Sequence, residues 1–208
     1  MVNNFNGRLY IFFIFCLFLF LNCSDKTTPE QKRYITQIQQ YRTDKDKFLS
    51  GEMRSPFNSR GNIKFHPLNY YDINFDFIFT GKVYQYSVKD TVTVYKSRGL
   101  ADKFLRFGFV IFNYKNKEYK LNIYKKISLS TIVFCIWFKD KTTNKTTNKT
   151  GRYIDFMYKD DPNFLYTIDF NLSYNPDCAY NSNFSSYMPT KEDYLDIEIT
   201  AGEKKFNN

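Results

Sequence analysis

The sequence predicts a mainly β protein, an antiparallel sandwich or barrel with one helix near its N-terminus. Three observations predict this class. Apolar residues follow a helical period up to about residue 49, they alternate with polar residues from residue 73 onward, and short polar turns separate the alternating runs. The length of 208 residues suits one domain with a sizeable core. We expect that domain to span residues 31–206.

A signal segment precedes this domain. Residues 9–21 form an unbroken apolar run, with Arg8 before it and the polar sequence Asn22-Cys23-Ser24-Asp25 after it. This arrangement is typical of a secretory signal. As a helix the run spans about 20 Å, against about 30 Å of hydrocarbon in a bilayer, which disfavours a transmembrane anchor. An ordinary cleaved signal and an uncleaved anchor remain as alternatives.

The end of this segment resembles the lipobox of bacterial lipoproteins, in which a cysteine is lipidated and becomes the first mature residue. The resemblance implies a signal peptide over residues 1–22, a lipid on Cys23 and a tether over residues 23–30. Asn22 departs from the smaller residue that is commoner before the cysteine. Two or more acyl chains hold a protein stably to a membrane. The resemblance therefore implies a protein of the bacterial cell envelope, anchored to a membrane through Cys23.

The formal net charge is +9, but the basic residues are spread along the chain without a five-residue block. A scattered positive charge is typical of a solvated surface. Nucleic acid is a poor partner for an exported protein, so we expect none. Aromatic residues make up 20% of the chain. They could form a stacking surface, but we favour codon bias as the explanation for the abundance of Phe, Tyr, Asn, Lys and Ile.

The first predicted element is a helix over residues 29–49. Thr28 is a suitable N-cap, Pro29 suits the first turn, and Ser50-Gly51 ends the segment. The residues that share an apolar face at helical spacing are Tyr34, Ile38, Tyr41 and Phe48.

About eight strands follow. Residues 104–112 and 118–125, joined by the polar turn 114–117, are predicted to form a hairpin. Residues 131–138 are apolar on both faces, which indicates a central strand. The other segments with strand periodicity are residues 73–79, 91–94, 152–158, 166–172 and 195–200. Residues 142–150, with the sequence TTNKTTNKT, are interpreted as a low-complexity loop.

Catalytic signatures are missing from the sequence. It contains no GxSxG, HExxH, GxGxxG or phosphate-binding glycine loop, and no CxxC or Cys/His cluster, so we expect no cofactor and no metal site. His66 is the only histidine. Beyond Cys16 and Cys23, two cysteines remain, Cys135 and Cys178. They could pair in an oxidising envelope, and the sequence leaves this open.

The best candidate site is C-terminal. Residues 152–156 and 168–171 are predicted to be two strands joined through the turn 160–163, with Asp155, Asp169 and Asn171 on the face opposite to the apolar residues. Two carboxylates there could bind a cation or divide acid and base roles, or they could simply be solvated.

The polar and aromatic loop after the second strand can fold over this face. It contains Asn175, Cys178 and Tyr180. Such a loop can form a pocket, and it can equally use its Asn side chains to satisfy its own backbone. The six candidate binding residues are Asp155, Asp169, Asn171, Asn175, Cys178 and Tyr180.

The chain also carries a long ordered string of motifs that resembles a known family. These motifs are Tyr41-Arg42, Asp44-Lys45-Asp46-Lys47-Phe48, Ser55-Pro56-Phe57, Gly151-Arg152-Tyr153, Asp155, Asp169-Phe170-Asn171, Tyr174-Asn175-Pro176, Cys178-Ala179-Tyr180 and Ala201-Gly202-Glu203-Lys204. The string resembles domain of unknown function 1684 over about residues 35–206. The resemblance implies no activity. Family members often carry a second cysteine eight residues after the one matching Cys178, where this chain has Ser186.

Three functional hypotheses follow. The first is a non-catalytic module on a lipid tether that binds a small ligand or serves as an accessory. The second is a hydrolase that uses Cys178 or Asp169 with His66. The third is a structural envelope lipoprotein without a ligand.

Overall fold

The N-terminal helix begins where the sequence predicts. The computed structural model describes residues 27–61, 63–127 and 131–206; the predicted signal and Cys23 lie outside them. Helix α1 spans Pro29–Gly51, and the Oγ1 of Thr28 accepts a hydrogen bond from the Gln31 backbone while the Gln31 side chain accepts one from the Thr28 backbone. This reciprocal capping box fixes the first turn.

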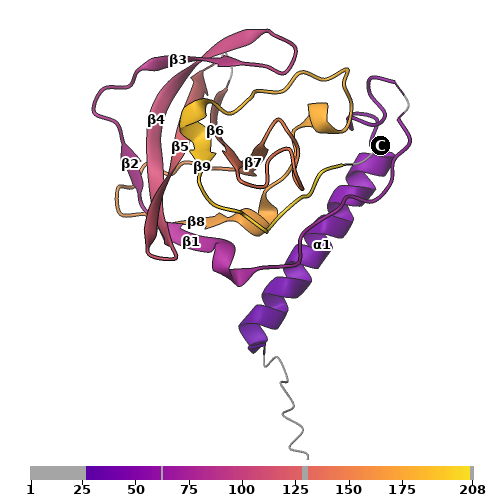
Figure 1. Ribbon diagram of the computed structural model, residues 1–208, viewed down its shortest axis with the longest axis horizontal. Coiled ribbons are helices and arrows are strands. Elements are labelled where there is room, and N and C mark those ends of the chain that lie inside the picture. The colour runs from indigo at the N-terminus through magenta and orange to yellow at the C-terminus, as the bar shows by residue number, and fades with distance from the viewer. Residues whose placement is uncertain (1–26, 62, 128–130, 207–208) are drawn as a thin grey trace, which may run out of the picture.

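The apolar face of α1 differs from the prediction. Ile38 is buried as expected, but the second buried residue is Leu49, and Phe48 is 47% exposed. Phe48 and Tyr41 instead line an open pocket. In Figure 1, α1 lies against one side of the β domain and the C-terminal segment ends near its last turns.

The described residues form nine strands. Their bounds are β1 Ile78–Gly81, β2 Val83–Gln85, β3 Thr91–Tyr95, β4 Ala101–Tyr114, β5 Lys117–Ile127, β6 Ile132–Asp140, β7 Arg152–Asp155, β8 Tyr166–Asp169 and β9 Tyr194–Leu195. One sheet has the order β2-β4-β5-β6-β7, with β3 also paired to β4 and β9 to β6, while β1 and β8 form a second sheet. All pairs are antiparallel except β6–β9. The predicted class, mainly antiparallel β with an N-terminal helix, is confirmed.

The predicted hairpin is β4–β5. Its turn places Lys115 and Asn116 at φ values of 49° and 62°. Two consecutive positive φ values characterise the turn that matches the twist of a two-residue hairpin loop. The predicted central strand is β6, which pairs with β5, β7 and β9.

The second predicted hairpin, residues 152–156 with 168–171, is wrong. Strand β7 pairs with β6, with Cys135 opposite Asp155, and β8 pairs with β1, with Ile78 opposite Asp169. The two strands therefore lie in different sheets, because each finds another partner that is distant in sequence. Alternation alone cannot identify that partner.

Several predicted strands are also shorter than expected. Residues 75–77 form a 3-10 helix capped by Asn74, and residues 170–172 form another after β8. Only Tyr194 and Leu195 of the C-terminal run pair as a strand. The predicted alternation there nevertheless holds, because Leu195, Ile197 and Ile199 are buried and the residues between them are exposed.

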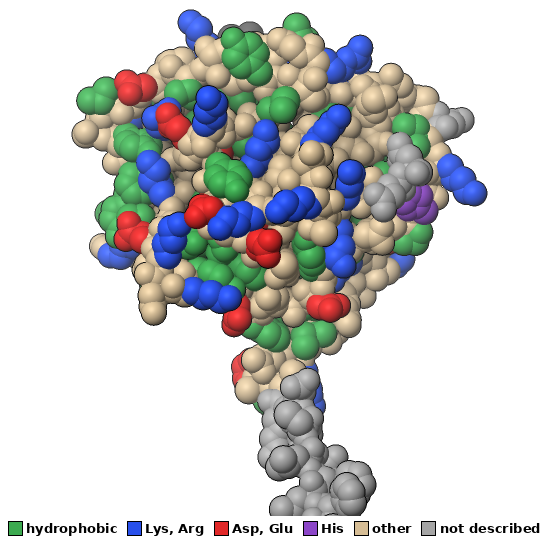
Figure 2. Space-filling view, viewed as in Figure 1, with side chains coloured by type: hydrophobic (Ala, Val, Ile, Leu, Met, Phe, Trp, Pro, Cys, Tyr) green, Lys and Arg blue, Asp and Glu red, His purple; other side chains and the backbone are tan. Residues whose placement is uncertain are grey.

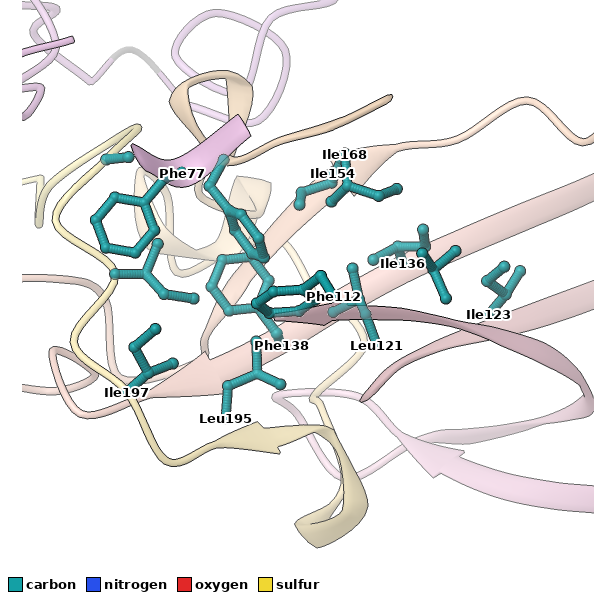
Figure 3. Close-up of a cluster of buried hydrophobic side chains, with 14 of the residues drawn as sticks. Phe77, Phe112, Leu121, Ile123, Ile136, Phe138, Ile154, Ile168, Leu195 and Ile197 are labelled. Atoms are coloured by element: carbon teal, nitrogen blue, oxygen red, sulfur yellow. The ribbon is translucent and has the colours of Figure 1, made fainter. Parts of the chain in front are cut away.

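The main core lies between the two sheets and the C-terminal segment. Figure 3 shows Ile123 of β5 and Ile136 of β6 on one side, with Ile168 of β8 and Ile197 packed among the same cluster. Phe170 is fully buried here and contacts Phe79, Phe112 and Phe138 through ring pairs 5.1 to 6.0 Å apart. This cluster fixes the short segment between β8 and the loop that lines the candidate site.

A second core lies on the other face of the large sheet, under residues 187–193. Asp193, 2% exposed, accepts hydrogen bonds from Asn122, Tyr124, Trp137 and Thr190, and so ties this segment to β5 and β6. A buried carboxylate with a full set of donors is satisfied.

The charge on the surface is scattered, as the sequence indicated. On the face shown in Figure 2, Lys and Arg side chains are spread over much of the surface, with Asp and Glu between them. No helix of the described residues is long and apolar enough to cross a membrane.

Candidate functional site

The six predicted site residues fall into three groups. Asp155 ends β7, Asp169 ends β8 with Asn171 in the turn after it, and the remaining three lie in the segment 175–180. The structure brings Asp155, Asn175 and Tyr180 together in one pocket, and places the other three elsewhere.

Asp169 and Asn171 form a structural anchor for α1. The Asp169 carboxylate accepts a hydrogen bond of 2.6 Å from the Tyr34 hydroxyl of the helix, and it also accepts from the backbone and side chain of Asn171. Asn171 donates to the Asn74 carbonyl and accepts from the Asn74 backbone. Both side chains are buried, at 7% and 1% exposure, so their hydrogen-bonding capacity is used within the chain.

The pocket lies between the C-terminal half of α1 and the segment 174–180, and has a volume of about 540 Å³. A volume in this range is typical of small-ligand sites. The residues that line it are Tyr41, Asp44, Lys45, Phe48, Leu49, Arg54, Pro56, Asp155, Tyr174, Asn175, Asp177 and Tyr180. Its walls are therefore aromatic and apolar, and three carboxylates lie around them.

One wall of the pocket is held by an ion pair between the helix and the C-terminal segment. Lys45 Nζ lies 2.5 Å from Glu203 Oε1 and 4.5 Å from the centroid of the Tyr174 ring. Glu203 is 1% exposed and also accepts from the Tyr180 hydroxyl and the Asn175 backbone. The Lys45 charge is thus neutralised within the chain.

The hydroxyl of Tyr174 donates to Asp155 Oδ1 at 2.6 Å, which orients both groups at the pocket. Across the pocket, Tyr41 is 37% exposed. Burial of its ring, with the negative charges of Asp155 and Glu203, raises the pKa of Tyr41 to about 12. Tyr41 is therefore a neutral donor over the physiological pH range.

Two acceptors of the pocket have no partner among the described residues. The Asp177 carboxylate lies at the exposed rim and makes no hydrogen bond or ion pair. Burial by its neighbours raises the pKa of Asp177, and the Lys45 charge opposes the shift. Asn175 is 2% exposed and its Oδ1 is likewise unpaired. Sequence reasoning missed Asp177, although it lies within the loop that was singled out.

The two described cysteines are unpaired. Cys135 lies in β6, where burial raises the pKa of its thiol to about 11. Cys178 lies behind the pocket, and its backbone donates to Ser186 Oγ at 3.2 Å. Ser186, at the position where the sequence resemblance implied a second cysteine, thus contacts Cys178 directly.

His66 lies outside the pocket. Its ring stacks on Phe206 with centroids 4.2 Å apart, and its Nδ1 is 3.3 Å from the Pro67 carbonyl oxygen. The described hydrogen bonds of Cys178 and Asp169 go to other groups. Among the described residues no group of three metal-ligating side chains comes together.

Sequence reasoning also missed a buried ion pair near the site. Arg152 and Asp140 are 1% and 2% exposed, and Arg152 Nη2 lies 3.1 Å from Asp140 Oδ2. Asp140 also accepts from Thr142 and Thr143. The repetitive segment 142–150 is a loop of turns, as predicted, and its first two residues contact this pair.

These features define a β domain of two sheets with a helix-lined pocket. A family described as "Protein of unknown function (DUF1684)" matches residues 63–204. The chain belongs to this family. The match begins after α1, so the helical wall of the pocket lies outside it, whereas the quoted motifs begin at Tyr41.

A solved structure has the same fold. It is the solution NMR structure of the uncharacterized protein from gene locus rrnAC0354 of Haloarcula marismortui, with a TM-score of 0.63 and 25% identity. The similarity covers 84% of this chain and 96% of that chain. No curated protein matches the chain.

Proposed function

We propose that this protein is a non-catalytic envelope lipoprotein whose β domain binds a small ligand in the pocket beside α1. The observation that carries the proposal is the pocket itself. It combines a volume of about 540 Å³ and aromatic walls with acceptors that the chain leaves unpaired. Mostly apolar sites with a few converging polar groups are typical of ligand-binding proteins.

The envelope location rests on the sequence. A short apolar run ends at Cys23, and the capped helix α1 begins only a few residues later, at Pro29. Five residues between the cysteine and the helix reach at most about 18 Å. A lipid on Cys23 would therefore hold the first turn of α1 near the membrane.

The pocket would then stand away from that membrane. Its helical wall begins at Tyr41, twelve residues after the start of α1. Twelve helical residues rise about 18 Å. With α1 upright on the membrane, a pocket at that height would be accessible to solutes of the envelope, which is consistent with a soluble ligand.

The hydrolase alternative has no observation in its favour. His66 packs on Phe206, and its ring nitrogen contacts the neighbouring Pro67 carbonyl. A nucleophile and base must come within hydrogen-bond reach of each other. The described contacts of His66, Cys178 and Asp169 do not bring them into such an arrangement.

Two variants test the pocket. Asp44→Trp places a large ring at the pocket wall, from an exposed position on α1. Thr43→Trp is the matched control, since Thr43 is exposed on the same helix and does not line the pocket. A small-molecule screen by thermal shift on the full-length chain in mild detergent should find compounds that stabilise the wild type and Thr43→Trp but not Asp44→Trp. Equal stabilisation of all three would place the binding site elsewhere.

Labelling with a fatty acid tests the anchor separately. Label should enter the wild type in bacterial cells and not the Cys23→Ala variant. Equal incorporation into both proteins would refute lipidation at Cys23, and would leave the pocket experiment unaffected.

A further inference from the structure

We infer that the pocket beside α1 selects an organic cation, a ligand with an ammonium group next to an apolar or aromatic body. This inference rests on the proposed function and names the class of its ligand. Three features of the pocket carry it: the sign of its charge, its aromatic walls, and the carboxylate and amide acceptors that the chain leaves unpaired.

The charge of the pocket is opposite to that of the chain. The formal net charge of the protein is +9, yet Asp44, Asp155 and Asp177 all line this pocket. Of the two basic residues that line it, Lys45 is paired with the buried Glu203, which leaves the exposed Arg54. Local carboxylates on an otherwise positive protein concentrate cations at one place and disfavour anions there.

The aromatic walls already hold one ammonium group. Lys45 Nζ lies 4.5 Å from the centroid of the Tyr174 ring while it pairs with Glu203. An ammonium group within about 6 Å of a ring centroid is attracted by the negative face of the ring. Tyr41 and Phe48 offer further rings, 37% and 47% exposed, on the helical wall. The contact of Lys45 with the Tyr174 ring is thus the same kind of ammonium–ring contact that we assign to the ligand.

The pocket leaves both acceptors and donors free among the described residues; the free donors are the Tyr41 hydroxyl and the exposed Arg54 guanidinium. The Asp177 carboxylate has no hydrogen bond or ion pair among the described residues, and the buried Oδ1 of Asn175 has none either. Asp155 accepts one described side-chain hydrogen bond, at Oδ1, from Tyr174. A ligand with N–H donors would satisfy these acceptors, whereas a carboxylate or phosphate ligand would leave them unpaired and would find donors only in Tyr41 and Arg54.

A second surface pocket of similar size shows the contrast. There Lys117 and Lys141 both pair with Asp196, at 3.0 and 2.9 Å. Asp196 is therefore neutralised by the chain, while the other carboxylate of that pocket, Glu198, has no hydrogen bond or ion pair among the described residues. The two pockets differ in their balance of charge. The pocket beside α1 has three carboxylates and Arg54, with Lys45 neutralised by Glu203, whereas the second pocket has Lys115, Lys117 and Lys141 beside Asp196 and Glu198.

Three probes with one ring and different charges test the inference on the full-length chain in mild detergent. They are benzylamine as the cation, benzyl alcohol as the neutral analogue and benzoate as the anion, each titrated by calorimetry and thermal shift. Benzylamine should bind, and should bind more weakly as salt is raised. The double variant Asp155→Asn/Asp177→Asn should weaken it by about tenfold or more. Glu118→Gln, which removes an exposed charge outside the pocket, should leave binding unchanged.

The outcomes separate this inference from the proposed function. If benzyl alcohol or benzoate binds as tightly as benzylamine, and Asp44→Trp abolishes that binding, the pocket binds ligands but does not select cations. If benzylamine binds and the double variant retains its affinity, the carboxylates do not recognise it. If none of the three probes binds, the selection of cations is refuted for ring-bearing amines. The small-molecule screen by thermal shift then determines whether the pocket binds a ligand of another class.

Discussion

The pocket beside α1 and the buried pair of Arg152 and Asp140 both gather charged groups, but they differ in how completely those groups are paired. Both Nη atoms of Arg152 donate to carbonyl or carboxylate oxygens, and both oxygens of Asp140 accept from the chain. In the pocket, the Asp177 carboxylate accepts no hydrogen bond from the described residues.

This difference separates a structural site from a binding site. A buried charge that loses its partners is costly, so the chain supplies a full set of partners where the charge serves the fold. A charge at the rim of a pocket remains partly solvated and can stay unpaired until a ligand arrives. The presence of charged residues alone therefore does not distinguish a binding site from a structural site, whereas the pairing of their hydrogen bonds does.

The largest expected effect is at Arg152. Arg152→Ala leaves Asp140 buried without its cation, and should lower the free energy of unfolding by about 3–5 kcal/mol in urea melts. Arg54→Ala is the control from the pocket, because that side chain is exposed. It should cost less than about 0.5 kcal/mol. Similar midpoints for the two variants would show that the buried pair does not support the fold.

An intermediate effect is expected at Asp169. Its carboxylate accepts from Tyr34 of α1 and from Asn171, so Asp169→Ala removes a charged acceptor from partly buried donors. The variant should lose about 1–3 kcal/mol. Asp161→Ala, at an exposed turn, should lose less than about 0.5 kcal/mol. If both variants unfold at the same urea concentration, Asp169 does not anchor the helix.

The sequence predicted the parts of the molecule that depend on local pattern. Thr28 and Pro29 marked the start of α1, the polar turn at residues 114–117 marked the β4–β5 hairpin, and an apolar run marked the central strand β6. Each of these depends on neighbours within a few residues. Period and capping are therefore enough to find them.

The main error of topology concerns partners distant in sequence. The pairing of β7 with β6, and of β8 with β1, separated Asp155 from Asp169 and overturned the predicted hairpin.

Half of the predicted site residues line the pocket, because the loop that carries Asn175 and Tyr180 does fold toward Asp155. The helical wall could not be foreseen. Tyr41 and Lys45 lie more than one hundred residues before that loop, and no local pattern indicates that α1 packs there. Asp177 could have been predicted from the sequence, because it is an acidic residue in the middle of the loop that carries Asn175 and Tyr180.

The smallest effect on stability, and the most informative on function, is expected at Asp177. Asp177→Asn should change the free energy of unfolding at neutral pH by less than about 0.5 kcal/mol, because the carboxylate has no partner to lose. Its signature should appear in the pH dependence. Burial raises the pKa of Asp177 in the folded state, so the folded protein holds this proton more tightly than the unfolded chain does.

The contribution of Asp177 to stability is therefore fully present below its unfolded pKa and is lost as the pH rises through the folded pKa. Urea melts between about pH 3 and pH 7 should show the wild type losing stability relative to Asp177→Asn over that interval, with Glu118→Gln lacking this trend. The affinity for benzylamine should rise over the same interval in the wild type, since only the ionised carboxylate attracts a cation, and should rise less in Asp177→Asn. A wild-type affinity that stays constant while Asp177 ionises would mean that this carboxylate does not contact the ligand.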